Sequence, residues 1–107
     1  MSIKKQFLKT KPVVKVTFEV SAKAAQGAES VFLICEALNW EKIQLKKLKT
    51  GNFKGVADLP TNQKEDFEYK FCLVMPDGSE IYDNDWEAEL YRSNGVDGDN
   101  SVVLVTT

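Results

Sequence analysis

Apolar and polar residues alternate along several short stretches of this 107-residue chain, as expected of β-strands with one buried face. The first clear stretch follows Pro12, where alternate positions are apolar: Val14, Val16, Phe18 and Val20. The segment from Phe53 to Leu59 alternates in the same way, and Pro60 ends it. Ser101 to Val105 is a β-branched run at the end of the chain. Each of these segments is predicted to be a strand.

The most informative stretch runs from Phe67 to Asp83 and is predicted to be a long hairpin. Its first strand carries an aromatic-rich face directed to the core and Lys70 on the opposite face, because Phe67, Tyr69, Phe71 and Leu73 alternate with Glu68, Lys70 and Cys72. Pro76 to Ser79 then forms the turn, since proline presets φ and Gly78 tolerates positive φ. The return strand, Glu80 to Asp83, includes Tyr82.

The remaining chain completes an all-β pattern. Val31 to Cys35 is a continuous apolar run, which predicts a central strand covered on both faces, and Ile43 to Leu48 alternates weakly. Ser21 to Ser30 and the acidic, turn-rich segment Asn84 to Asn100 are expected to be loops. About seven short strands separated by turns predict a single antiparallel, immunoglobulin-like β-sandwich over residues 12–107.

Residues 1–11 form a basic N-terminal extension. Its lysines are Lys4, Lys5, Lys9 and Lys11, and its apolar residues Ile3, Phe7 and Leu8 either dock on the sandwich or stay unstructured. The extension lacks the apolar core and small-residue cleavage site of a signal peptide. No apolar run is long enough to span a membrane. A cytoplasmic protein is therefore expected.

Composition narrows the classes of partner. Charged residues make up 28% and the formal net charge is −2, so no basic surplus drives binding to nucleic acid or to an anionic membrane. Hydrophobic residues make up 43%, which suits one domain with one core. Cys35 and Cys72 lie in apolar runs rather than in a CxxC motif, and buried free thiols are expected rather than a disulfide.

The chain contains no histidine, which excludes Ser-His-Asp and Cys-His triads and most zinc sites. Acidic residues alternate from Asp83 to Glu89, and Asp97 to Asn100 has a superficially calcium-like composition. Neither run has the EF-hand spacing needed to converge six or more oxygens on one ion. We therefore expect solvated loop acids, with no metal and no cofactor.

Several segments resemble one family in order and spacing. They are VTF at 16–18, VFLICEALNW at 31–40, the Leu59-Pro60 pair, FEYKF at 67–71 and the following Asp-Gly turn. The chain beyond residue 12 is thereby similar to the starch- and glycogen-binding early-set sandwiches. That family includes the glycogen-binding domain of the AMP-activated kinase β subunit, isoamylase-type N-terminal domains and the glucoamylase starch-binding domain.

The resemblance implies a sugar-binding site of four residues. Trp40 falls on the aromatic that follows the second strand, and Lys70 is the lysine of the YKF motif. Tyr82 matches the second aromatic, on the return strand, and Asn100 matches an asparagine that hydrogen-bonds glucose hydroxyls. The chain departs from the family at Cys35, where glycine is usual, at Ala37-Leu38, where Phe-Asn is usual, and at Trp86, where proline is common.

The function implied is non-catalytic binding of α-glucan, either alone or for a glucan-active enzyme acting in trans. Exposed rings offer the aliphatic face of a pyranose an apolar, electron-rich surface, and Lys70 and Asn100 supply donors to vicinal hydroxyls. Two rings set at an angle suit the curvature of an α-linked chain. A shallow site of this kind supports a Kd of roughly 10⁻⁴ to 10⁻⁵ M.

Other readings of the same residues remain open. Trp40 is either an exposed ligand contact or a core residue. Tyr82 is either a platform, that is, a ring on which a sugar stacks, or a cross-strand packing residue. Asn100 either binds sugar or caps a turn. Trp86 is a cover over the open edge of the core or a third platform. An alternative function is an early-set domain that has lost sugar binding and acts as a protein-interaction or regulatory module, which the altered loop from Cys35 to Leu38 favours. Paired carboxylates also suggest glycosidase activity, but a small sandwich has little volume for the cleft that this activity requires. We therefore expect that the protein is not an enzyme.

Overall fold

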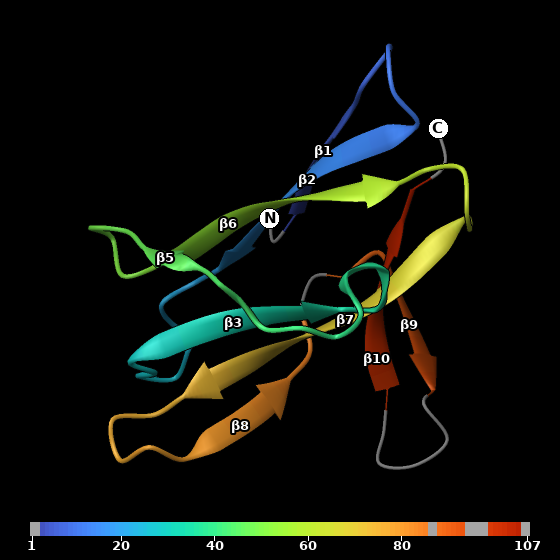
Figure 1. The fold of residues 1–107 in the computed structure, drawn as a ribbon. Helices are drawn as coiled ribbons and strands as arrows, with labels where there is room; N and C mark the ends of the chain where they lie inside the picture. Colours follow the sequence, from blue (N-terminus) through green and yellow to red (C-terminus); the bar gives the residue numbers. More distant parts are fainter. Residues whose placement is uncertain (1–2, 86–87, 94–98, 106–107) are drawn as a thin grey trace.

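Two antiparallel β-sheets face each other in the computed structural model, which describes residues 3–85, 88–93 and 99–105 (Figure 1). Within these residues the elements are the following: β1 (Ile3–Phe7), β2 (Val13–Val20), β3 (Ser30–Cys35), the 3-10 turn η1 (Glu36–Leu38), β4 (Ile43–Gln44), β5 (Lys46–Lys47), β6 (Phe53–Pro60), β7 (Asp66–Val74), β8 (Glu80–Asp83), β9 (Leu90–Ser93) and β10 (Asp99–Leu104). The predicted all-β sandwich is confirmed, with about ten strands rather than seven.

The strand order is that of an immunoglobulin-like sandwich. The first sheet has the order β1-β2-β6-β5, and the second has the order β4-β3-β7-β10-β9, with β8 paired to β7. These correspond to the ABED and C′CFG sheets of immunoglobulin domains. β8 and β9 lie between β7 and β10 in the chain, in what would be the loop joining strands F and G.

The core lies between the sheets and is built from the alternate apolar positions that the sequence shows. Phe18 of β2 packs edge-on against Tyr69 of β7, with ring centroids 5.2 Å apart, and against Phe71 at 6.4 Å. Tyr69 and Phe71 also meet edge-on, at 5.8 Å. All three side chains are buried. Contact between β2 and β7 therefore joins the two sheets through a cluster of aromatic rings.

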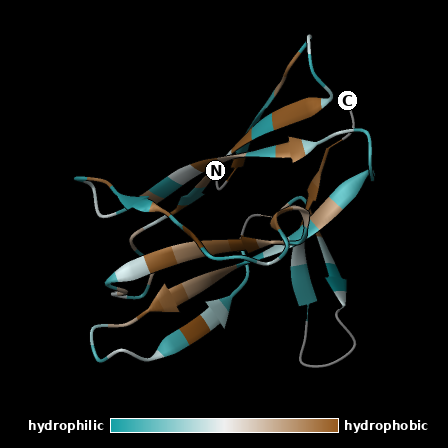
Figure 2. Ribbon diagram, in the orientation of Figure 1, coloured by the Kyte–Doolittle hydropathy of each residue, from teal (hydrophilic) through white to brown (hydrophobic). Residues whose placement is uncertain are grey.

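The prediction that β3 is covered on both faces is wrong for one face. Val31, Leu33 and Cys35 are buried against the first sheet, whereas Phe32 and Ile34 on the outer face are only half-buried. Figure 2 shows β3 in hydrophobic colours along most of its length, after a more hydrophilic start. An apolar run does not distinguish a strand with two covered faces from one whose outer face is partly open to solvent.

The segment from Ile43 to Leu48 was predicted as one strand, but it belongs to both sheets. β4 pairs with β3 in the second sheet, and β5 pairs with β6 in the first. Leu45 lies between them, buried, and its N–H donates to the carbonyl of Val31 at 2.8 Å. A Cβ at Gly55 would lie 2.5 Å from a methyl of Leu45, so the chain crosses between sheets where glycine leaves room.

Two further segments form strands. Ile3–Phe7 of the N-terminal extension pairs with β2 along its whole length, and Ile3 is buried, so this segment docks on the sandwich. The expected loop from Asn84 to Asn100 contains β9, paired with β10, and the first two residues of β10. The prediction of a loop is therefore wrong for Leu90–Ser93 and for Asp99 and Asn100. Each of the segments Ile3–Phe7 and Leu90–Ser93 hydrogen-bonds to the strand that follows it in the chain, and its own sequence does not reveal that pairing.

Candidate functional site

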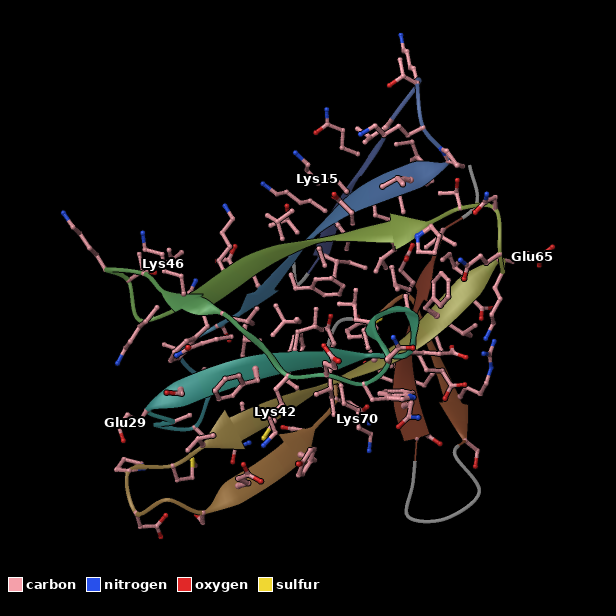
Figure 3. The ribbon with its side chains drawn as sticks, viewed as in Figure 1. Lys15, Glu29, Lys42, Lys46, Glu65 and Lys70 are labelled. Carbon is pink, nitrogen blue, oxygen red and sulfur yellow. The ribbon has the colours of Figure 1, made fainter. Side chains whose placement is uncertain are left out.

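Lys70 lies on the outer face of the second sheet, as its alternation predicts. It pairs with Ile34 of β3, at the position where β7 passes from pairing with β10 to pairing with β8. Figure 3 shows the Lys70 side chain, like that of Lys42, on the side of this sheet turned away from the first sheet. Among the residues that the structure describes, no ion pair or hydrogen bond engages the Lys70 ammonium. A cation with this freedom is available as a donor to a ligand.

Tyr82 lies on the same outer face as Lys70. It pairs with Cys72, two residues along β7 from Lys70, so Lys70 and Tyr82 are diagonal neighbours with Cα atoms roughly 7–8 Å apart. The tyrosine is 51% exposed, which argues against a packed cross-strand residue. The electrostatic effect of the Cys72 side chain raises the pKa of Tyr82. The Tyr82 ring is therefore open to solvent on the outer face.

Trp40 is 44% exposed and not part of the core. It follows η1, and both Asn39 and Trp40 have left-handed φ, 57° and 60°. The Trp40 N–H donates to the carbonyl of Cys35 at 3.0 Å, which brings its backbone to the end of β3, one residue from the pair formed by Ile34 and Lys70. Positive φ in a bulky residue costs of order 1–3 kcal/mol, and strain of this kind concentrates at functional sites.

Asn100 of β10 also belongs to this face. Continuing the register in which Ser101 pairs with Tyr69 places Asn100 opposite Lys70. Its side-chain N–H donates to Glu68 Oε1 at 2.8 Å, so one of its two donors is engaged within the protein. The second N–H and the oxygen of the Asn100 side-chain amide are available to bind a ligand.

Beside Lys70 and Tyr82, the outer face carries a second cation and ring that sequence reasoning missed. The Lys42 ammonium lies 5.9 Å from the centroid of the Phe32 ring and 2.6 Å from Glu80 Oε2. Phe32 pairs with Cys72, so the row Phe32, Cys72 and Tyr82 crosses three strands. Cys72 is buried in this row rather than in the core cluster, and burial raises the pKa of its thiol. The alternation of residues 67–73 already placed Cys72 on the same face as Lys70.

The other cysteine, Cys35, is buried in the core between the sheets, where desolvation raises the pKa of its thiol to about 11. The expectation of two buried free thiols is confirmed. A thiol with a raised pKa carries little thiolate at neutral pH and is a poor nucleophile.

An ion-pair cluster borders the site at the other end of the face. Arg92 of β9 binds Asp66 at 2.9 Å and Glu68 at 3.5 Å, and Lys64 binds Glu36 at 2.6 Å. The Lys64 hydrogen bond lowers the pKa of Glu36, and the Arg92 hydrogen bond lowers the pKa of Asp66. No sequence signal joined Arg92 to these acids, because β9 was expected to be a loop.

These two lowered pKa values predict a loss of stability in acid. The carboxylates favour folding while ionised, so their contribution is present above the ordinary carboxyl pKa and is lost as pH falls from there through the lower folded-state pKa. Both pairs are partly exposed, so the contribution of each to stability is small. Urea unfolding followed across this range should show a smaller decline for the double variant Lys64→Gln, Arg92→Gln than for the wild type. Equal declines would contradict the assignment.

Several expectations concern residues outside the described part of the chain. Trp86, Glu87 and the segment 94–98 fall there, and with them the possible third platform and much of the calcium-like run. Within the described ranges, no group of three or more Cys, Asp or Glu side chains converges to hold a metal. No helix in those ranges has the length and apolar character needed to cross a membrane. No protein-family model and no curated protein matches this chain.

Proposed function

We propose that this protein binds α-glucan, without catalysis, on the outer face of the sheet formed by β4, β3, β7, β8 and β10. One observation carries the proposal: the exposed Tyr82 ring and the unengaged Lys70 ammonium are diagonal neighbours on this face. Trp40 supplies the second ring, from a loop whose backbone closes on the end of β3. Asn100, opposite Lys70, supplies the further polar contact.

The chemistry of these groups suits a neutral, hydroxylated ligand. Tyr82 and Trp40 would stack on the aliphatic faces of successive glucose units at low cost in side-chain entropy. Lys70 would donate to vicinal hydroxyls from the rigid strand between them. Because Tyr82 and Trp40 are both exposed, much of the bound sugar would remain hydrated. We therefore expect a modest affinity, with a Kd of roughly 10⁻⁴ to 10⁻⁵ M.

The ionisation of the neighbouring acids supports binding rather than hydrolysis. A glycosidase needs one carboxylic acid whose pKa is raised so that it stays protonated near neutrality. On this face, Arg92 lowers the pKa of Asp66 and Lys64 lowers that of Glu36. The carboxylates that border the site are therefore ionised and ion-paired, whereas a hydrolase would need a protonated one.

Two buried free thiols suit a reducing compartment, and we propose that the protein is cytoplasmic.

The test is a titration with maltoheptaose, read by amide chemical shifts. We expect saturable shifts centred on Trp40, Lys70 and Tyr82. Trp40→Ala and Tyr82→Ala should each weaken binding tenfold or more, about 1.4 kcal/mol, because each removes a stacking surface. Lys70→Met should weaken it, whereas Lys15→Met, a strand lysine on the outer face of the other sheet, should not (Figure 3).

Cellohexaose provides a matched ligand control, because its β-linked chain is flat and should not fit two angled rings. If the amide shifts of the folded wild type do not change at millimolar maltoheptaose, sugar binding is rejected. The alternative function, a protein-interaction or regulatory module, would then remain. Release of reducing sugar by the purified protein would reject both.

A further inference from the structure

A lysine-rich hairpin projects from the edge of the first sheet. β5, the turn after it and the start of β6 carry four lysines between residues 46 and 54, Lys46, Lys47, Lys49 and Lys54, and no acidic residue. All four side chains are exposed. Figure 3 shows Lys46 at the far end of the molecule from Glu65. β5 is the terminal strand of its sheet, so its outer backbone edge has no neighbouring strand among the described residues.

Two of these lysines face each other directly. Lys46 pairs with Lys54 in the register between β5 and β6, and like charges in this relation destabilise a sheet. Lys54 in turn pairs with Glu19 of β2, but the Glu19 carboxylate accepts a hydrogen bond from Asn52 Nδ2 at 2.9 Å. The row across the sheet is therefore Glu19, Lys54, Lys46 and then an open edge.

Within the described residues, no ion pair compensates the charge of the hairpin lysines, unlike that of three basic residues on and beside the second sheet. There, Lys42, Lys64 and Arg92 are each ion-paired to a carboxylate. In the part of the chain that the structure describes, none of the hairpin lysines takes part in an ion pair. An exposed lysine edge protects a sheet from pairing with another copy of itself. That protection requires lysine on β5 and does not require a second lysine opposite it on β6.

A groove lies beside the hairpin, where the chain crosses from one sheet to the other. Its volume is ≈ 420 Å³, and its lining includes Leu45, Lys46, Lys47, Phe53 and Ser30. The Lys47 ammonium lies 5.8 Å from the centroid of the Phe53 ring at one wall. One carboxylate, that of Glu29, also lines the groove. Both residues of β5, Lys46 and Lys47, line the groove, so a strand added beside β5 would lie next to it.

We propose that this edge binds an extended acidic segment of a partner protein, which pairs with β5 and places a carboxylate beside Lys46. The added carboxylate would compensate the charge of Lys46 from its open side and continue the row as Glu19, Lys54, Lys46 and acid. Backbone hydrogen bonds along the strand would give affinity, and the lysines would select an acidic sequence. This site is separate from the proposed glucan site and does not depend on it.

The chemistry of the edge favours a polypeptide over a nucleic acid. The hairpin holds lysine and no arginine, the residue suited to bidentate recognition of phosphate. The one arginine of the chain, Arg92, is already ion-paired in the other sheet. The net charge of −2 opposes long-range attraction of a polyanion such as DNA.

The test uses a synthetic peptide of alternating glutamate and threonine, titrated into the full chain at low salt and followed by amide shifts. We expect saturable shifts confined to β5, β6 and the groove, lost at high salt. Lys46→Glu should weaken binding at least tenfold while raising the urea midpoint, because it replaces a like-charge pair with an ion pair to Lys54. Glu29→Gln should tighten binding, and Lys15→Gln, outside the hairpin, should leave it unchanged.

The opposite results would overturn the proposal. Peptide binding that survives Lys46→Glu, or shifts centred elsewhere, would show that this edge is not the site. Absence of binding by a folded wild type would leave edge protection as the role of the lysines. If oligo(dT), or vesicles containing phosphatidylserine, bind as tightly as the acidic peptide or more tightly, the surface binds other anions. The proposal that its partner is an acidic polypeptide segment would then be rejected. A peptide with lysine in place of glutamate should not bind.

Discussion

Phe18→Ala is expected to lower the free energy of unfolding by about 3–5 kcal/mol, the cost of removing a large buried aromatic side chain. Phe18 is fully buried on β2 and contacts two rings of β7 edge-on, Tyr69 at 5.2 Å and Phe71 at 6.4 Å between ring centroids. The truncation removes apolar contact from both sheets and leaves a cavity between them. Because small domains have only about 5–15 kcal/mol of stability in total, the variant should be close to unfolding at ambient temperature.

Urea denaturation followed by circular dichroism measures this loss. Val56→Ala is the matched control, because Val56 lies on β6 with 53% of its surface exposed and should change stability by less than about 1 kcal/mol. A loss below about 1 kcal/mol for Phe18→Ala would mean that the aromatic cluster does not join the sheets.

Tyr69→Phe is expected to lower the free energy of unfolding by about 1.5–3 kcal/mol, although it keeps the ring. The Tyr69 hydroxyl donates to Asp85 Oδ2 at 2.7 Å, and both residues are buried. Burial, and the hydrogen bond to Asp85, raise the pKa of Tyr69, so the hydroxyl keeps its proton and remains a donor. Its loss removes a hydrogen bond from a buried acidic side chain, which costs more than the loss of a neutral exposed bond.

The effect should extend to the proposed glucan site. Asp85 also receives a hydrogen bond to its carbonyl from the Tyr91 hydroxyl at 2.6 Å, and its N–H donates to Ser101 Oγ at 2.8 Å. These bonds hold the chain just after β8, the strand that carries Tyr82, against β9 and β10. Tyr69→Phe should therefore broaden the amide signals of β8 and weaken maltoheptaose binding without touching the sugar.

A double-mutant cycle isolates this interaction. Tyr69→Phe combined with Asp85→Asn should show a coupling energy, because the two groups share one hydrogen bond. Tyr82→Phe is the control, since that hydroxyl lies at the surface, and its stability should differ little from the wild type. Strict additivity of the two single changes would contradict the assignment.

Periodicity predicted much of the fold, because alternation is a local property that any half-buried strand must show. The strands β2, β6, β7, β8 and β10 are confirmed close to their predicted positions. The turn at Pro76 to Ser79 is also confirmed, since Gly78 has a φ of 88° and the Met75 N–H donates to the carbonyl of Ser79 at 2.8 Å. The outward direction of Lys70 followed from the same alternation.

Pairing partners could not be predicted in this way. Ile3–Phe7 became an edge strand because β2 presents a free side, and Leu90–Ser93 became a strand because β10 does. Ile43 to Leu48 divides at Leu45 because β3 and β6, which receive its two halves, belong to different sheets. These outcomes depend on hydrogen bonds between residues far apart in the chain.

The same division applies to the candidate site. The ring at Tyr82, the ring at Trp40 and the cation at Lys70 were identified from the sequence through a resemblance, and their functional roles stay predictions. Their exposure and the shared face of Lys70 and Tyr82 were decided by strand register, since a shift of one residue would turn Tyr82 to the other side. The engagement of Asn100 by Glu68 and the like-charge pair of Lys46 and Lys54 likewise came only from register.

The sequence by itself determined that this chain is an all-β sandwich, where most of its strands lie and which side chains could serve a ligand, because each of these follows from short-range pattern and residue chemistry. Only the tertiary structure decided which of those side chains meet, which are already bound by neighbours and which edge is left open. The physical reason is that strand pairing joins distant segments, and burial and charge compensation depend on the neighbours that pairing supplies.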